Sequence, residues 1–390
     1  MKQQAIFCEQ NDSISKNLYS EYGVKRGLRD EKGQGVLTGL TNISDIKAFE
    51  YRDGVKSPCD GELSYRGYNI KDLVTGSKGK RFVFEEGAYL LLFGELPTDT
   101  QLMEFQGRLS DCMELPTNFT RDVIMKAPTS DIMGSMTRSI LTLGSYDKEK
   151  ESLEIPNVLR QSMQLIAVFP MLAVYAYHAY CHYEKNESMY IHRPEKDLSI
   201  AENFLRLLRP DTKFTELEAR VLDIALLLHM EHGGGNNSTF TTRVVTSSGS
   251  DTYSVISAAM SSLKGKKHGG ANLMVMNMMD DIKSHVKDYE DEEEIASYLS
   301  KILKKEAFDQ KGLIYGMGHA VYSISDPRER VFKGFVEQLA RDKGREKDMT
   351  LYNNIEKIAP KLIAKQRQIF KGVSPNIDFY SGFVYDMLNI

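Results

Sequence analysis

Three short segments of this 390-residue chain each place a histidine among glycines. They are residues 231–235, 267–271 and 316–320, and the chain holds only eight histidines in all. Glycine permits tight or left-handed turns and leaves room for a ligand beside the backbone. Histidine is the side chain best suited to share a proton near neutral pH. A fourth segment, residues 376–382, adds the carboxylate of Asp378. Together the four segments predict an enzyme that moves a proton without a metal.

Each histidine also has a simpler interpretation. His229 and His232 are three residues apart and could share a helix face as a metal pair. The HExxH pattern is absent and no third ligand lies nearby in the sequence, which disfavours a metal. His232 could instead bond the last carbonyls of a helix, although the glycines after it favour ligand contact. His268 precedes a helix start beside several lysines, which fits an anion-binding corner or a solvated basic turn equally well.

Residues 316–319 favour a loop whose backbone wraps a ligand, and an arginine follows soon after it. Asp326-Pro327-Arg328 places that arginine on a turn fixed by proline, and arginine can hold a carboxylate through two parallel hydrogen bonds. Taken alone, Arg328 would be a surface ion-pair residue and Asp378 an ordinary turn aspartate. The GxxxxGK[ST] pattern of a nucleotide phosphate loop is absent.

Helical periodicity dominates after about residue 84 and predicts the elements that position these residues. Residues 215–218 fit a capping box at the start of a helix that delivers His229 and His232 to its C-terminal end. Strand patterns are few. Further helices are expected at 84–93, 198–208, 254–264 and 271–286, and strands around 35–38 and 47–51. The prediction is a mainly α fold with minor N-terminal β structure.

Composition narrows the class of protein. The apolar fraction is 41% and the formal charge is −4, so no basic excess indicates a nucleic-acid partner. Residues 165–180 are almost wholly apolar but fall short of the roughly 20 residues that a bilayer requires. Pro170 interrupts them, so a buried, kinked or broken core helix is expected. The N-terminus lacks a signal-peptide core, and four scattered cysteines favour free thiols in a soluble, cytoplasmic protein: Cys8, Cys59, Cys112 and Cys181.

From about Tyr22 onward, the chain resembles the citrate synthase family. The matching segments appear in the family's order, which makes the set far more specific than any one motif: residues 60–68, 84–97 and 201–205, then those around His232, His268, His319, 326–328 and 376–382. The resemblance implies a multi-helical homodimer. Each subunit would have a large domain, residues 1–267 and 379–390, and a small CoA-binding domain, residues 268–378.

The resemblance implies a reaction and assigns roles in it. Acetyl-CoA would condense with oxaloacetate and water to citrate and CoA, a step of the tricarboxylic acid cycle, with no permanently bound cofactor or metal. Asp378 would remove the methyl proton, while His268 donates a hydrogen bond to the thioester oxygen. His319 would polarise the ketone of oxaloacetate, which His232 and Arg328 hold. CoA would lie on a cradle of Leu313, Ile314, Gly316, Met317 and Gly318, with Lys371 for its phosphates.

Two departures from the family pattern bear on activity. Ser323 stands where the family often has an arginine for CoA phosphate. The sequence ends at Ile390, where the family usually continues with arginines for substrate carboxylates, so slow or absent condensation with retained CoA binding is expected. Two alternatives stay open: a 2-methylcitrate synthase that uses propionyl-CoA, and a weakly active or non-catalytic CoA-binding protein. One methylene changes specificity by only about 1–3 kcal/mol.

Overall fold

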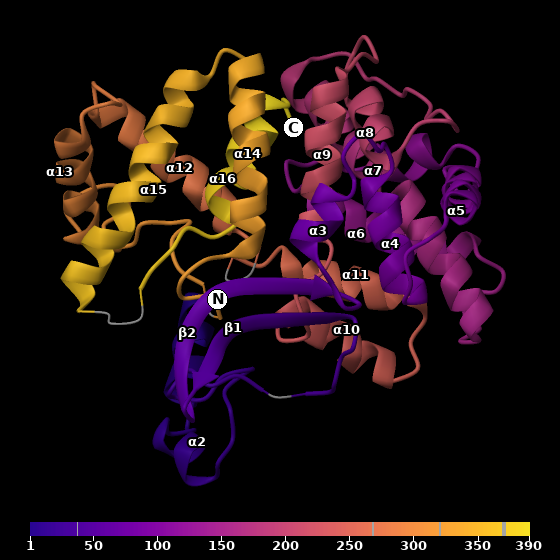
Figure 1. The fold of residues 1–390 in the computed structure, drawn as a ribbon. Coiled ribbons are helices and arrows are strands. Elements are labelled where there is room, and N and C mark those ends of the chain that lie inside the picture. The colour runs from indigo at the N-terminus through magenta and orange to yellow at the C-terminus, as the bar shows by residue number, and fades with distance from the viewer. Residues whose placement is uncertain (37, 267–268, 320, 369–371) are drawn as a thin grey trace.

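The computed structural model describes residues 1–36, 38–266, 269–319, 321–368 and 372–390. It is mainly helical, as the sequence predicts (Figure 1). The first helices are α1 (Lys2–Gln10), α2 (Asn17–Glu21), α3 (Ile70–Thr75), α4 (Val83–Phe93), α5 (Asp99–Asp111), the π-helical turn η1 (Thr120–Ile124), α6 (Ile132–Tyr146), α7 (Ile155–Lys185), α8 (Ile200–Leu208) and α9 (Glu216–His229). They are followed by α10 (Asn237–Ser247), α11 (Thr252–Leu263), α12 (Ala271–His285), α13 (Glu292–Leu303), α14 (Pro327–Asp342), α15 (Glu346–Arg367) and α16 (Asp378–Met387). The four predicted helices are confirmed to within two residues at each end.

A small antiparallel sheet precedes the helical body. It has the order β1 (Ser44–Arg52), β2 (Val55–Tyr65) and β3 (Tyr68–Asn69). The β1–β2 turn has positive φ at both Asp53 and Gly54, which suits the twist of a two-residue hairpin. The strand predicted at 47–51 is confirmed within β1. The strand predicted around 35–38 is wrong for the described residues 35, 36 and 38, where only an isolated bridge from Gly35 to Arg29 forms.

The helices form two lobes above this hairpin (Figure 1). Helices α12–α16 make up one lobe and α3–α9 the other, and α9 packs against α14 where the lobes meet. One apolar core joins α9 to α12 and α14–α16 across that boundary. A second core lies among α4–α8 in the α3–α9 lobe and reaches α11. Helix α16 packs on α12 and α14. The division into two domains stays a prediction.

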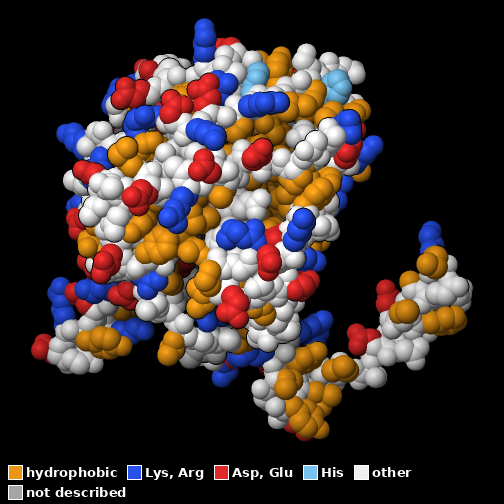
Figure 2. Space-filling model, turned by 90° about the vertical axis from the view of Figure 1, so that its right-hand side faces the viewer, with side chains coloured by type: hydrophobic (Ala, Val, Ile, Leu, Met, Phe, Trp, Pro, Cys, Tyr) orange, Lys and Arg blue, Asp and Glu red, His pale blue; other side chains and the backbone are white. Residues whose placement is uncertain are grey.

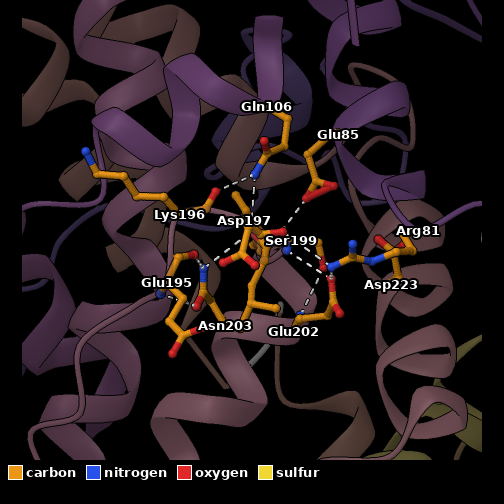
Figure 3. A network of polar contacts seen from close by, with 12 residues as sticks. Arg81, Glu85, Gln106, Glu195, Lys196, Asp197, Ser199, Glu202, Asn203 and Asp223 are labelled. Atoms are coloured by element: carbon orange, nitrogen blue, oxygen red, sulfur yellow. Dashed lines mark hydrogen bonds and ion pairs between the residues drawn. The ribbon is translucent and has the colours of Figure 1, made fainter. Parts of the chain in front are cut away.

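Two buried carboxylates fix the starts of helices in the α3–α9 lobe (Figure 3). Asp223 of α9 accepts hydrogen bonds from the backbone N–H groups of Val83 and Phe84, each at 2.9 Å. Glu85 accepts one from the N–H of Ile200 at 3.1 Å. Burial raises the pKa of Asp223 to about 7, and burial together with Asp223 raises the pKa of Glu85. These carboxyl groups accept hydrogen bonds from backbone N–H groups that have no partner within their own helix.

Helix α7 corrects the interpretation of the apolar segment. It runs unbroken for 31 residues through Pro170, so the possibility of a broken helix was wrong. By length and composition alone it could cross a membrane. However, more than half of its apolar stretch is buried inside the fold, and the core helices of soluble proteins can be equally long and apolar. On the face shown in Figure 2, acidic and basic side chains are interspersed.

Candidate active site

The C-terminal end of α9 presents two histidines. The predicted capping box is confirmed, because the side chain of Thr215 accepts from the Glu218 N–H and that of Glu218 from the Thr215 N–H. The helix ends at His229, and His232 lies in the loop that follows. Nδ1 of His229 lies 2.7 Å from the carbonyl oxygen of Ala225, to which a protonated Nδ1 donates. His229 is exposed to solvent, but the surrounding protein still lowers its pKa.

His319 adopts one defined tautomer. Its Nδ1 accepts hydrogen bonds from the backbone N–H groups of Val321 at 3.0 Å and Tyr322 at 3.2 Å. A nitrogen that accepts carries no proton, so the proton of the neutral ring lies on Nε2. Burial lowers the pKa of His319 and favours that neutral form. His319 can therefore offer Nε2–H to a ligand oxygen.

His232 lies beside His319 and is also neutral. Their ring centroids are 5.1 Å apart, and Nε2 of His232 lies 3.0 Å from the hydroxyl of Tyr322. Burial, assisted by Arg328, lowers the pKa of His232 to about 3. At neutral pH, His232 can thus give a ligand one N–H hydrogen bond but no positive charge.

Arg328 is a buried group rather than a surface ion-pair residue, with 8% of its surface exposed. Its Nη2 and Nε donate to Asp326 at 2.9 and 3.2 Å. Burial acts to raise the pKa of Asp326, but Arg328 holds it below its usual value. Oδ2 of Asp326 also accepts from the N–H of Ile377 at 3.2 Å. Among the described residues nothing bonds Nη1 of Arg328, which leaves this nitrogen for a ligand.

Asp378 is the first residue of α16 and not a simple turn residue. The side chain of Asn376 accepts from the Asp378 N–H at 3.0 Å and donates to the carbonyl of Gly318 at 2.7 Å. The N–H of Asn376 donates to the carbonyl of Gly316 at 2.9 Å. Burial raises the pKa of Asp378, whereas His229 and Arg328 act to lower it. A raised pKa makes a carboxylate a stronger base.

The glycine loop borders a cavity next to these groups. Gly316 has φ +83°, and a Cβ there would lie 3.0 Å from Cα of Phe379, so only glycine fits. The cavity measures about 370 Å³. Four of the five predicted cradle residues line it, whereas Gly316 packs on Phe379. Its lining includes Leu313, Ile314, Met317, Gly318, His319, Tyr322, Ser323, Arg367 and, from β1, Phe49.

Two predicted residues, His268 and Lys371, lie outside the described residues, so their positions stay predictions. Within the described ranges, no group of three or more His, Cys, Asp or Glu side chains is arranged to hold a metal ion. A larger cavity of about 1,460 Å³ lies between α3, α9 and α14 and includes none of the predicted site residues.

The sequence interpretation assigned no role to three residues of this site. Tyr322 contacts His232 although 90 positions separate them in the chain. Asp326 orients Arg328, and its position two residues before that arginine was the available signal. Arg367 lines the 370 Å³ cavity and donates to the carbonyl of Gly312 at 3.1 Å. It ends α15, and nothing in the local sequence links it to the glycine loop.

The sequence and the fold match enzymes that transfer acyl groups. The family model "Citrate synthase, C-terminal domain" matches residues 30–390. The citrate synthase of Synechocystis sp. is 34% identical over 358 residues, covering 90% of this chain and 80% of that protein. The 2-methylcitrate synthase of Shewanella oneidensis is 33% identical, covering 84% of this chain and 78% of that protein.

Solved structures agree with these relatives. The citrate synthase of Pyrobaculum aerophilum superposes with a TM-score of 0.74 at 27% identity, covering 93% of this chain and 83% of that one. The citrate synthase of Thermoplasma acidophilum, solved as a ternary complex with carboxymethyl coenzyme A and oxaloacetate, superposes with a TM-score of 0.74 at 25% identity, covering 91% of this chain and 83% of that one. The chain belongs to the citrate synthase family.

Proposed function

We propose that this protein condenses acetyl-CoA with oxaloacetate and water to give citrate and CoA. The observation that carries the proposal is the grouping of four residues: His232, His319, Arg328 and Asp378. The rings of His232 and His319 are in contact, Arg328 acts electrostatically on both histidines and on Asp378, and His319 lines the glycine-loop cavity. A neutral N–H donor, a buried arginine and a carboxylate of raised pKa are the groups that this condensation requires.

Oxaloacetate binding falls to Arg328 and His232. Nη1 of Arg328 supplies a charged hydrogen bond to a carboxylate, and His232 supplies a neutral one. Nε2–H of His319 then points at the ketone oxygen, polarises it, and donates a proton as the alkoxide forms. Preorganised donors of this kind contribute about 10²–10³ in rate.

Asp378 acts on the other substrate. Its carboxylate takes a proton from the methyl group of the thioester, and the resulting enol or enolate carbon forms the new bond to the ketone carbon of oxaloacetate. His268 is the proposed donor to the thioester oxygen during this step. Water then cleaves the citryl thioester, which releases citrate and CoA. The CoA portion rests on the loop from Leu313 to Gly318, with Lys371 as a proposed phosphate contact.

The proposal includes a cytoplasmic homodimer that acts in the tricarboxylic acid cycle. The four cysteines are free thiols, which fits a reducing compartment. Closed twofold dimers are the commonest assemblies of soluble enzymes. Sedimentation of the purified protein tests the dimer.

A second candidate is 2-methylcitrate synthesis from propionyl-CoA, because a 2-methylcitrate synthase is nearly as similar to the chain as a citrate synthase is. Measuring kcat/KM for acetyl-CoA and propionyl-CoA with oxaloacetate separates the two. We expect acetyl-CoA to be preferred. A preference for propionyl-CoA would instead assign 2-methylcitrate synthesis to this protein. Absence of turnover with both, alongside CoA binding by calorimetry, would instead make the protein a CoA-binding member of the family.

A further inference from the structure

Helices α14 and α16 each contribute one residue to the proposed site, and α15 lies beside them in the same lobe (Figure 1). Arg328 is the second residue of α14, and Glu329 follows it. Asp378 is the first residue of α16, and Tyr380 comes two residues later. Glu329 and Tyr380 are buried, with 3% and 0% of their surface exposed, and the mechanism does not use either of them.

Both side chains meet Glu356 of α15. The carboxyl group of Glu329 is in hydrogen-bond contact with that of Glu356. The hydroxyl of Tyr380 donates to Oε2 of Glu356, and Nζ of Lys333 lies 2.9 Å from the same oxygen. Oε1 of Glu329 is buried and has no hydrogen-bond partner among the described residues.

Two carboxyl groups in contact cannot both be ionised, so the pair holds one proton at neutral pH. Lys333 and Tyr380 both stabilise a negative charge on Glu356, which leaves the proton with Glu329. The groups that act on Glu329 are Lys333 of α14, Asp326 immediately before α14, and Glu356 of α15. Burial, with Glu356, raises the pKa of Glu329 to about 9.

Tyr380 connects α16 to this pair of carboxyl groups through its hydrogen bond to Glu356. Burial, then Glu356, Glu329 and Glu337, raise its pKa far above the usual range, so it remains a donor when Glu329 ionises. The three helices are thus joined by one hydrogen-bonded chain, from Glu329 through Glu356 to Tyr380.

We propose that Glu329 is a positioning residue for the condensation: as a neutral acid it shares its proton with Glu356 and so holds α16, which carries Asp378, in register with α14, which carries Arg328. The proposal rests on the proposed function for its effect on catalysis, but its proton chemistry stands without it. Loss of the proton would set two like charges against each other in the packed lobe. A displacement of about 1 Å at a reacting group can cost 10²-fold in rate.

The test compares the wild type with Glu329→Gln, Glu329→Ala and the control Glu306→Gln. Glu306 is exposed and lies on the segment after α13. The glutamine at 329 keeps a donor to Glu356 at every pH, whereas alanine removes it. The readouts are kcat against pH, and the infrared band of protonated carboxyl groups at pH 7.5.

We expect wild-type kcat to fall above about pH 9 as Glu329 loses its proton. Glu329→Gln should keep kcat within about threefold at pH 7.5 and lose this alkaline decline, and Glu329→Ala should lose at least tenfold. The protonated-carboxyl band should lose the contribution of one group in both variants at 329 and remain unchanged in Glu306→Gln.

Superposable pH profiles for the wild type and Glu329→Gln would overturn the positioning role, even if Glu329→Ala were less stable. An unchanged infrared band in Glu329→Gln would overturn the shared proton. An inactive wild type whose band nevertheless weakens in Glu329→Gln would count against the proposed function and leave the shared proton supported.

Discussion

The hydroxyl of Tyr322 lies 3.0 Å from Nε2 of His232 and so ties the loop after α9 to the loop that carries His319. His319 Nδ1 accepts from the backbone N–H of the same tyrosine. The orientation of both site histidines therefore depends on Tyr322.

Removing this hydroxyl should weaken oxaloacetate binding. A net hydrogen bond contributes about 0.5–1.5 kcal/mol, so Tyr322→Phe should raise the KM for oxaloacetate roughly 2- to 12-fold. The KM for acetyl-CoA should change less. Tyr298→Phe is a matched control, because the Tyr298 hydroxyl donates to Asp281 on the far side of the α12–α16 lobe. Equal oxaloacetate KM values for Tyr322→Phe and the wild type would show that the contact does not orient His232.

Asp378→Asn should abolish condensation while CoA binding is retained. A positioned base contributes about 10²–10⁴, and we expect a loss of roughly 10³ in kcat. Asp386→Asn is the control on the same helix, since Asp386 is largely exposed and pairs with Arg345. Steady-state kinetics and calorimetric titration with CoA provide the readouts. Near-full activity of Asp378→Asn would exclude this carboxylate as the base.

Arg328→Lys should raise the Kd for oxaloacetate. An ammonium group cannot replace the planar guanidinium group, which donates to Asp326 through Nε and Nη2 and leaves Nη1 for the substrate. Losing a charged hydrogen bond costs about 1.5–3 kcal/mol, or roughly 10- to 150-fold in Kd. Arg330→Lys serves as the control, because Arg330 is exposed and pairs with Asp60. Calorimetry that finds equal oxaloacetate affinity for Arg328→Lys and Arg330→Lys would assign Arg328 a structural role only.

Glu85→Gln should change how stability depends on pH. The folded-state pKa values of Glu85 and Asp223 are both raised, so the folded protein binds protons more strongly than the unfolded chain. The stability due to this pair is therefore complete below about pH 4 and declines as the pH rises through the folded values, with Asp223 at about 7. Glutamine keeps the acceptor for the Ile200 N–H and removes one charge.

The measurement is Tm from pH 4.5 to 8 for the wild type and Glu85→Gln. The wild-type Tm should fall more steeply with rising pH than that of the variant, and the variant should gain most at pH 8. Parallel curves would show that the pair does not retain a proton in the fold.

Local signals in the sequence were enough to predict several elements. The capping box at Thr215 and the end of the helix predicted at 84–93 depend on neighbours within a few residues, and both are confirmed. The grouping of His232, His319 and Arg328 followed from the ordered motifs. Strand β2 was missed because Pro58 and Gly61 hide its pattern, and it is held by pairing with β1.

Contacts between distant segments account for the rest. Oδ2 of Asp326 accepts from Ile377, 51 residues away, and Asp223 caps a helix start 140 residues before it. Neither partner can be read from the neighbouring residues. Helix α7 continues through Pro170 because the surrounding core, rather than local propensity, determines its course.

Asn376 fixes the position of the glycine loop relative to the proposed base, Asp378. Its backbone N–H donates to the carbonyl oxygen of Gly316. Its side chain donates to the carbonyl oxygen of Gly318 and accepts a hydrogen bond from the N–H of Asp378. For a thioester bound on the loop as proposed, this hydrogen-bonded segment would set the distance between the acyl group and Asp378. Tolerance for a longer acyl group would then depend on the room beside the segment rather than on a change in the distance between the loop and Asp378.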